Sequence, residues 1–151
     1  MSERVPVNWV VVADGARARI YEHTRIGGGL AALAAMDHDK AHGHARDLGS
    51  DRPGRVFDST GAGRHAVAPH TDYLRYEKDK FAHEIAALLE HAGTGRRFDR
   101  LVLVAPPRTL GDLRAAMGAH AKAAVIGEVH KDLTHAADRD IAEHLGAVMA
   151  V

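Results

Sequence analysis

The opening stretch VNWVVVADGARARIYEH, residues 7–23, decides the fold of this chain. Residues 7–13 form a short and nearly continuous apolar run, and Asp14-Gly15 follows it directly. Asp-Gly between two strand-like segments is a strong signal for a β-hairpin, because both central residues of a type I′ turn need positive φ. The return strand is then residues 16–23. The sequence therefore predicts that the chain begins with two antiparallel strands.

The return strand alternates between two kinds of side chain. One face is largely small and apolar, and it holds Ala16, Ala18, Ile20 and Glu22. The other face carries Arg17, Arg19 and Tyr21. Successive residues of a strand point to opposite faces of the sheet. We interpret the arginine face as a solvated outer face, and a face that contacts an anion is the alternative.

Downstream of this hairpin the apolar pattern predicts one more strand and a long helix. Residues 27–29 make a turn, and residues 30–36 can form the third strand, although this segment is rich in Ala. Asp72 is a candidate N-cap for a helix over residues 72–91 that ends near Gly93. Its apolar stripe consists of Phe81, Ile85, Leu88 and Leu89.

The last third of the chain alternates between strands and helices. Residues 101–105, LVLVA, have the pattern of a strand covered on both faces, which belongs in the centre of a sheet. Pro106-Pro107 ends it, and Thr109 to Asp112 resembles a capping box for a second helix. Its inward residues are Leu110, Leu113 and Met117. A fifth strand over residues 124–129 and a helix over residues 136–149 follow, the helix with Ile141, Leu145 and Val148 inward.

The order of elements is therefore β-β-β-α-β-α-β-α. A meander followed by alternating helices and strands implies a mixed sheet, because right-handed crossovers make the later strands parallel. This is the ribonuclease H-like order. At 151 residues the chain is expected to form one α/β domain over residues 1–151.

Composition narrows the classes of function. Lys plus Arg and Asp plus Glu are 20 each, so no overall field attracts nucleic acid or an anionic membrane. A polyanion site must be a local patch, and no DNA partner is expected. The chain has no Cys, which excludes disulfides and thiolate chemistry. It shows no signal peptide and no apolar run long enough to span a bilayer, so we expect a cytoplasmic protein. No cofactor is expected, and a homo-oligomer is left open.

The main candidate site is the stretch at residues 50–72, SDRPGRVFDSTGAGRHAVAPHTD. Its apolar residues have neither the helical nor the strand period, so it reads as a long loop, and loops of this length are usually functional or disordered. Its arginines, and the backbone amides that its glycines leave accessible, suit the recognition of phosphate or carboxylate. The alternative is that the arginines pair with the aspartates of the loop and only hold it closed. The candidate ligand-binding residues are Asp51, Arg52, Arg55, Asp58, Gly61, Gly63, Arg64 and His65, with Asp14, Arg17 and Arg19 as secondary candidates.

Three catalytic or metal-binding readings rest on weaker patterns. Asp37, His38, His42 and His44 invite a metal site, with His42 and His44 as candidate ligands, but polar loops readily collect solvated His and Asp. Asp14 could begin the carboxylate set of a two-metal nuclease, but Ala105-Pro106-Pro107 supplies no second carboxylate. A hydrolase could pair Ser59 or Thr60 with His65 or His70, without any nucleophile elbow.

Several stretches resemble the bacterial family of proteins required for attachment to host cells. They are WVVVADGARARIYE, the loop at residues 50–72, FAHEIAALL, LVLVAPPRTLGDLR and KDLT, and together they span nearly the whole chain. That family is similar to the middle domain of archaeal and eukaryotic class-1 peptide release factors, which has a ribonuclease H-like fold and a Gly-Gly-Gln loop tip. Here Gly61-Ala62-Gly63-Arg64-His65 stands at the corresponding place without the Gln.

The resemblance implies a release-factor-like binding module, associated with RNA or ribosomes through the Arg/Gly loop. Its hydrolytic role does not carry over because the Gln is absent. A role in attachment would be indirect, since the sequence shows no export signal or anchor. The alternative is a hydrolase of esters or phosphoesters with His65 as general base, so whether the protein is an enzyme is left open.

Overall fold

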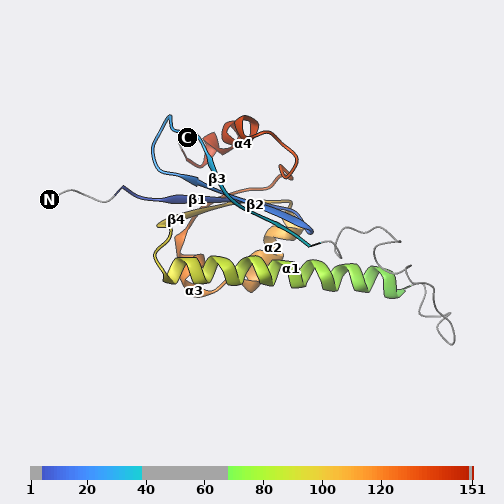
Figure 1. The fold of residues 1–151 in the computed structure, drawn as a ribbon. Coiled ribbons are helices and arrows are strands. Elements are labelled where there is room, and N and C mark those ends of the chain that lie inside the picture. The colour runs from blue at the N-terminus through green and yellow to red at the C-terminus, as the bar shows by residue number, and fades with distance from the viewer. Residues whose placement is uncertain (1–4, 39–67, 150) are drawn as a thin grey trace.

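The structure is a computed structural model that describes residues 5–38, 68–149 and 151, with side chains on α1 described from residue 72. One five-stranded sheet has the order β3-β2-β1-β4-β5, and helices lie on both of its faces (Figure 1). The strands are β1 (Asn8–Ala13), β2 (Arg17–His23), β3 (Ala31–Asp37), β4 (Arg100–Val104) and β5 (Val125–Val129). The helices are α1 (Ala68–Thr94), α2 (Pro107–Ala116), α3 (Ala119–Ala124), α4 (Asp138–His144) and a 3-10 turn at Leu145–Ala147.

Strand directions confirm the predicted mixed sheet. β2 pairs antiparallel with both β1 and β3, whereas β1, β4 and β5 run parallel. The sheet is open and belongs to an α/β fold with the ribonuclease H-like order of strands. β4 lies inside the sheet, as its continuous apolar run predicted. No helix within the described residues is long and apolar enough to cross a membrane.

The hairpin between β1 and β2 is present, but its predicted type I′ turn is wrong. Neither Asp14 nor Gly15 has the positive φ that such a turn needs. The Asp14 carboxylate instead accepts hydrogen bonds from the backbone N–H groups of Ala16 and Arg17, each at 2.7 Å. This side-chain bonding to local backbone is the other way in which Asp forms turns.

The first long helix begins earlier and ends later than predicted. α1 starts at Ala68, so Asp72 is not its N-cap and residues 68–72 do not belong to a loop. Pro69 misled the sequence analysis, because Pro is tolerated in the first turn of a helix, where its missing N–H would have no partner. At the other end, Gly93 lies within the helix, and Arg96 takes the left-handed conformation with φ of 59°.

The second half of the chain departs from the predicted boundaries in three places. α2 begins at Pro107 with Pro106 as its N-cap and no side-chain cap, so the predicted capping box at Thr109 is wrong. The short helix α3 was not predicted and takes Ala124 from the expected fifth strand. The last helix is α4 plus a 3-10 turn, and is shorter than residues 136–149.

The sheet separates two apolar cores, because β1 and β4 are buried on both faces. Trp9, Val11 and Leu103 face α1, α2 and α3, whereas Val10 and Val102 face α4. On the first side, the helices contribute Phe81, Ile85, Leu89, Leu110, Leu113 and Met117, as the apolar stripes predicted. Ile141 and Leu145 cover the second side, also as predicted.

The arginine face of β2 is solvated only at Arg17, whose side chain is 42% exposed, and the expectation is wrong for Arg19 and Tyr21. Tyr21 is 1% exposed in the core under α4, and its hydroxyl donates to Asp138 Oδ1 at 2.9 Å. Burial, together with this hydrogen bond, raises the pKa of Tyr21. Arg19 stacks over the Tyr21 ring, 5.8 Å from its centroid. The segment that follows β5 covers this face, which alternation within β2 could not reveal.

Candidate anion-binding pocket

A pocket of about 570 Å³ opens at the carboxyl ends of β1 and β4. Three segments line it: the turn after β1, the first half of α1, and the start of α2. The lining residues are Asp14, Gly15, Ala16, Leu74, Arg75, Lys78, Pro106, Arg108, Thr109 and Asp112. β2 and β3 extend the sheet on one side of β1, and β4 and β5 extend it on the other. Open α/β sheets bind ligands at such a switch point, outside the carboxyl ends of the strands.

Three cationic side chains line this pocket from two helices. Arg75 of α1 forms an ion pair with Asp112 of α2, which joins the two walls and fixes the guanidinium. Lys78 lies one helical turn further along α1, and its stem covers Gly15. A Cβ on Gly15 would lie 2.8 Å from Lys78 Cδ, so a larger residue here would displace the lysine stem. Within the described residues, neither Lys78 nor Arg108 has a carboxylate in ion-pair range.

The third wall is the N-terminus of α2. The first backbone hydrogen bond of this helix runs from Leu110 N–H to Pro106 O at 2.9 Å. The preceding N–H groups of Arg108 and Thr109 therefore have no partner within the helix, and Pro106 provides no side-chain cap. These amides and the helix dipole favour negative charge at the same wall that carries the Arg108 side chain.

Asp14 joins this edge of the sheet to the segment after β5. Its Oδ1 accepts the two turn hydrogen bonds, and its Oδ2 lies 3.1 Å from the Thr134 hydroxyl. The same hydroxyl lies 2.7 Å from Asp132 Oδ1. Because a hydroxyl carries one proton, Thr134 can donate to only one of these carboxylates at a time. Asp14 thus forms the turn and also contacts the opposite layer of the fold.

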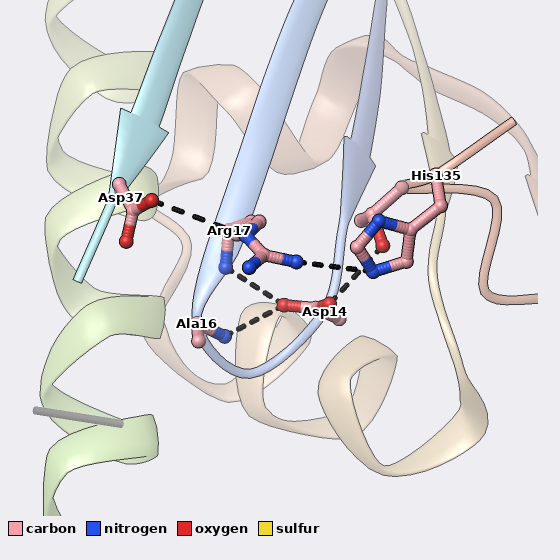
Figure 2. A network of polar contacts seen from close by, with 6 residues as sticks. Asp14, Ala16, Arg17, Asp37 and His135 are labelled. Carbon is pink, nitrogen blue, oxygen red and sulfur yellow. Dashed lines mark hydrogen bonds and ion pairs between the residues drawn. The ribbon is translucent and has the colours of Figure 1, made fainter. Parts of the chain in front are cut away.

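Arg17 and Arg19, both secondary candidates, have structural partners on that opposite layer. Arg17 Nη1 lies 3.0 Å from His135 Nε2, and Arg17 Nε lies 3.9 Å from Asp37 Oδ2 (Figure 2). Since arginine only donates, His135 Nε2 is the acceptor in this contact. Arg19 Nη2 donates to the carbonyl oxygens of residues 133 and 136, both at 3.0 Å. Arg19 therefore holds the covering segment and does not reach the pocket.

A second polar contact lies where β3 meets α1. His38 Nε2 is 2.6 Å from Glu77 Oε1, and His38 Nδ1 is 3.6 Å from Glu84 Oε1. The imidazole stacks on Phe81 with 5.5 Å between ring centroids. His42 and His44 lie outside the described residues. Among those that the structure describes, no group of three or more His, Asp or Glu could hold a metal ion.

The structure therefore places only part of the predicted site. Asp14 and Arg17 lie together at the carboxyl edge of the sheet, and Arg19 lies under the covering segment. The remaining candidates lie outside the described residues: Asp51, Arg52, Arg55, Asp58, Gly61, Gly63, Arg64 and His65. The sequence analysis missed Arg75, Lys78 and Arg108 as site residues. A weak signal existed, because Arg75 and Lys78 have the i, i+3 spacing of one helix face.

One family model matches residues 9–145, and its description is "Protein required for attachment to host cells". No curated protein matches. The solved structures that are similar include two archaeal proteins. One is the archaeal translation termination factor aRF1, at 9% identity and a TM-score of 0.48 over 81% of this chain and 29% of that one. The other is described only as an archaeal protein, at 9% identity and a TM-score of 0.47 over 93% of this chain and 38% of that one. This chain thus spans about a third of their lengths.

Proposed function

The chain belongs to the family of proteins required for attachment to host cells, and we propose that it is a cytoplasmic module that binds the phosphate backbone of single-stranded RNA. One observation carries this proposal: Arg75, Lys78 and Arg108 converge on one pocket at the switch point of the sheet. A part in attachment would then be indirect and would follow from RNA or ribosome binding.

Charge and shape of the pocket both support a phosphate ligand. The guanidinium groups supply planar donors, Lys78 adds a point charge, and the start of α2 adds oriented N–H groups. The chain as a whole has no net charge, so attraction for a polyanion depends on this local cluster. A volume of about 570 Å³ lies within the usual range for small-ligand sites, and accommodates one nucleotide unit at a time.

The carboxylates of the pocket support RNA as the polyanion. Asp14 and Asp112 lie beside the cations, and a carboxylate accepts hydrogen bonds from hydroxyl groups. The ribose 2′-OH is the group by which proteins distinguish RNA from DNA. Binding of a phosphate on the cations would bring an adjacent ribose within reach of these acceptors.

The predicted Arg/Gly loop would extend this site. The chain enters α1 at Ala68, and Arg75 follows seven residues later, about 10 Å along the helix axis. We propose that Arg52, Arg55, Arg64 and His65 add further phosphate contacts before the pocket. Arg64→Ala is then expected to weaken RNA binding without any effect on the pocket residues.

A salt series of RNA binding tests the proposal. Fluorescence anisotropy with a labelled single-stranded RNA would compare the double variant Lys78→Ala/Arg108→Ala with Lys80→Ala/Arg100→Ala. The control removes the same charges from α1 and β4, at exposed residues that do not line the pocket. A plot of the logarithm of the RNA association constant against the logarithm of the salt concentration has a negative slope. Loss of two phosphate contacts should make this slope less steep by about 1.4, in the first variant only.

Two results would overturn the proposal. One is an absence of salt-sensitive RNA binding by the unchanged protein, and the other is an equal loss of binding in both double variants. Cosedimentation with ribosomes, with the same pair of variants, examines whether the RNA is ribosomal. A comparison of RNA with single-stranded DNA of the same sequence tests whether the ribose hydroxyl contributes to binding.

A further inference from the structure

The three walls of the pocket are joined to one another in a ring. The stem of Lys78 on α1 lies against Gly15 in the turn after β1, where an added Cβ would come within 3.0 Å of three stem carbons. The ion pair between Arg75 and Asp112 joins α1 to α2. α2 begins shortly after β4, which lies beside β1 in the sheet, so its first residues lie next to that turn. Contacts thus close the pocket on each of its sides.

The core of the protein closes the floor of this ring. α1 and α2 lie on the same face of the sheet (Figure 1), and Leu110 of α2 belongs to the buried core between them and the strands. Ala13 and Ala105 directly precede the lining residues Asp14 and Pro106, and both are fully buried. The pocket therefore opens on the side away from the sheet. A terminal phosphate enters such an opening directly, whereas an internal phosphodiester requires the RNA chain to turn back on itself at the mouth.

The free donors of the pocket suit a terminal phosphate better than a phosphate within the chain. Within the described residues, Lys78 and Arg108 have no ion-pair partner, and the N–H groups of Arg108 and Thr109 have none within α2. A terminal phosphate offers three free oxygens and a charge of about −1.5 to −2 at pH 7, whereas an internal phosphodiester offers one oxygen fewer and a single charge. Asp14 also lines the pocket, but its two oxygens already contact the N–H groups of the turn and the Thr134 hydroxyl. The terminal group therefore uses more of the donors that the two helices present.

We infer that the pocket holds the terminal phosphomonoester of an RNA strand, in preference to a phosphate within the chain. This inference rests on the proposed RNA binding, and it specifies which phosphate of the RNA the pocket takes. Lys78 and Arg108 bind the phosphate oxygens, the start of α2 donates its N–H groups, and the rest of the strand leaves through the mouth. The same phosphate group occurs at a 5′ end, at a 3′ end and in a free nucleoside monophosphate, so the experiments distinguish these sources.

Three RNAs of one sequence, each with an internal fluorescent label, test this inference. One carries a 5′-phosphate, one carries a 3′-phosphate, and one has hydroxyl groups at both ends. In anisotropy titrations, at least one phosphorylated RNA should bind about tenfold more tightly than the hydroxyl form, and the end that does so identifies the source. Lys78→Ala/Arg108→Ala should abolish this difference, and the control Lys80→Ala/Arg100→Ala should retain it. Equal affinity for the three RNAs overturns the inference but not the proposed RNA binding, and a difference that survives in the first variant overturns the assignment to this pocket.

Nucleoside monophosphates test the pocket without the rest of the strand. In isothermal titration calorimetry, adenosine 5′- or 3′-monophosphate should bind the unchanged protein with a dissociation constant on the order of millimolar or below. Adenosine should bind more weakly, and Lys78→Ala/Arg108→Ala should remove the difference between the two compounds. A monophosphate that binds no better than adenosine, or that binds this variant equally well, overturns the inference. Binding of the monophosphate by a protein that binds none of the RNAs overturns the proposed function alone, and leaves the pocket as a site for phosphomonoesters.

Discussion

The contact between His38 and Glu77 fastens the end of β3 to α1, and its removal should destabilise the fold strongly. Glu77 is 3% exposed, and among the described residues its only hydrogen-bond partner is the His38 ring, at 2.6 Å. His38 lies at 13% side-chain exposure and also stacks on Phe81. His38→Ala leaves a buried carboxylate without this partner.

The expected cost follows from the burial of the pair. Loss of the partner of a buried hydrogen-bonding group costs about 1 to 3 kcal/mol, and more when that group is charged, because the group stays buried without a partner. Glu77 is a buried carboxylate, and the partial exposure of His38 lets water into the vacated space, so we expect about 3 kcal/mol. With an unfolding entropy of about 2.1 cal/mol/K per residue, 151 residues convert this into a fall in Tm of about 9 °C.

Glu77→Gln provides the comparison that isolates the charge. The amide keeps the shape of the side chain and can still bond to the imidazole, and His38 keeps Glu84 at 3.6 Å. Its cost should be about 1 kcal/mol, the usual value of a single hydrogen bond. The two variants should thus differ about threefold in their effect on the free energy of unfolding.

Urea unfolding at neutral pH measures both effects. His83→Ala is the control, because His83 lies on the same helix with a side chain that is 62% exposed and an exposed partner, Asp79. Its change should stay within about 0.5 kcal/mol of zero. The reasoning is refuted if His38→Ala behaves like this control, or if Glu77→Gln costs as much as His38→Ala.

Two further predictions concern the ends of helices. Arg96 has φ of 59°, and glycine adopts this conformation without steric cost, so Arg96→Gly should raise the free energy of unfolding by about 0.5 to 1 kcal/mol, measured by urea unfolding; a loss of stability would contradict this. Glu90 accepts from the Ala121 N–H at the start of α3 and from the His120 ring, which lower the pKa of its carboxyl below 4.5. Its contribution to stability is therefore present above the unfolded pKa and is lost as pH falls through the folded pKa, so Tm should fall more steeply with acidification in the unchanged protein than in Glu90→Gln. Parallel Tm curves from pH about 6 to about 3 would contradict this prediction.

The five strands and their order along the chain were predictable because their signals are local. Asp14-Gly15 between two apolar runs indicated the first hairpin, and the five-residue run ending at Ala105 indicated a central strand. Both signals depend on neighbours within a few residues. The predicted helix starts were wrong where proline was involved, because proline both interrupts regular structure and is tolerated in the first turn of a helix. Pro69 and Pro107 were interpreted as interruptions, and each lies in the first turn of a helix.

The site was less predictable because its residues come from distant segments. Asp14, Lys78 and Arg108 are separated by tens of residues, and only the sheet order places the end of β1 beside the end of β4. The face of Arg19 was misread for the same reason. Alternation within β2 shows that two faces differ, but not that residues 133–136 cover one of them.

Asp14 bonds to both layers of the fold at the carboxyl edge of the sheet, and this affects how the pocket binds a ligand. Asp14 Oδ1 would suffice to form the turn, yet Asp14 Oδ2 also contacts Thr134 on the layer that carries α4. Three stretches on which the family resemblance rests, at residues 9–22, 101–114 and 131–134, therefore each contribute residues to this edge. A turn held from both layers keeps Gly15 beneath Lys78, while Asp112 holds Arg75 across the pocket. Arg75 is thus in place before a ligand arrives and adds little ordering cost when a phosphate binds, whereas Lys78 and Arg108 are ordered by the phosphate itself.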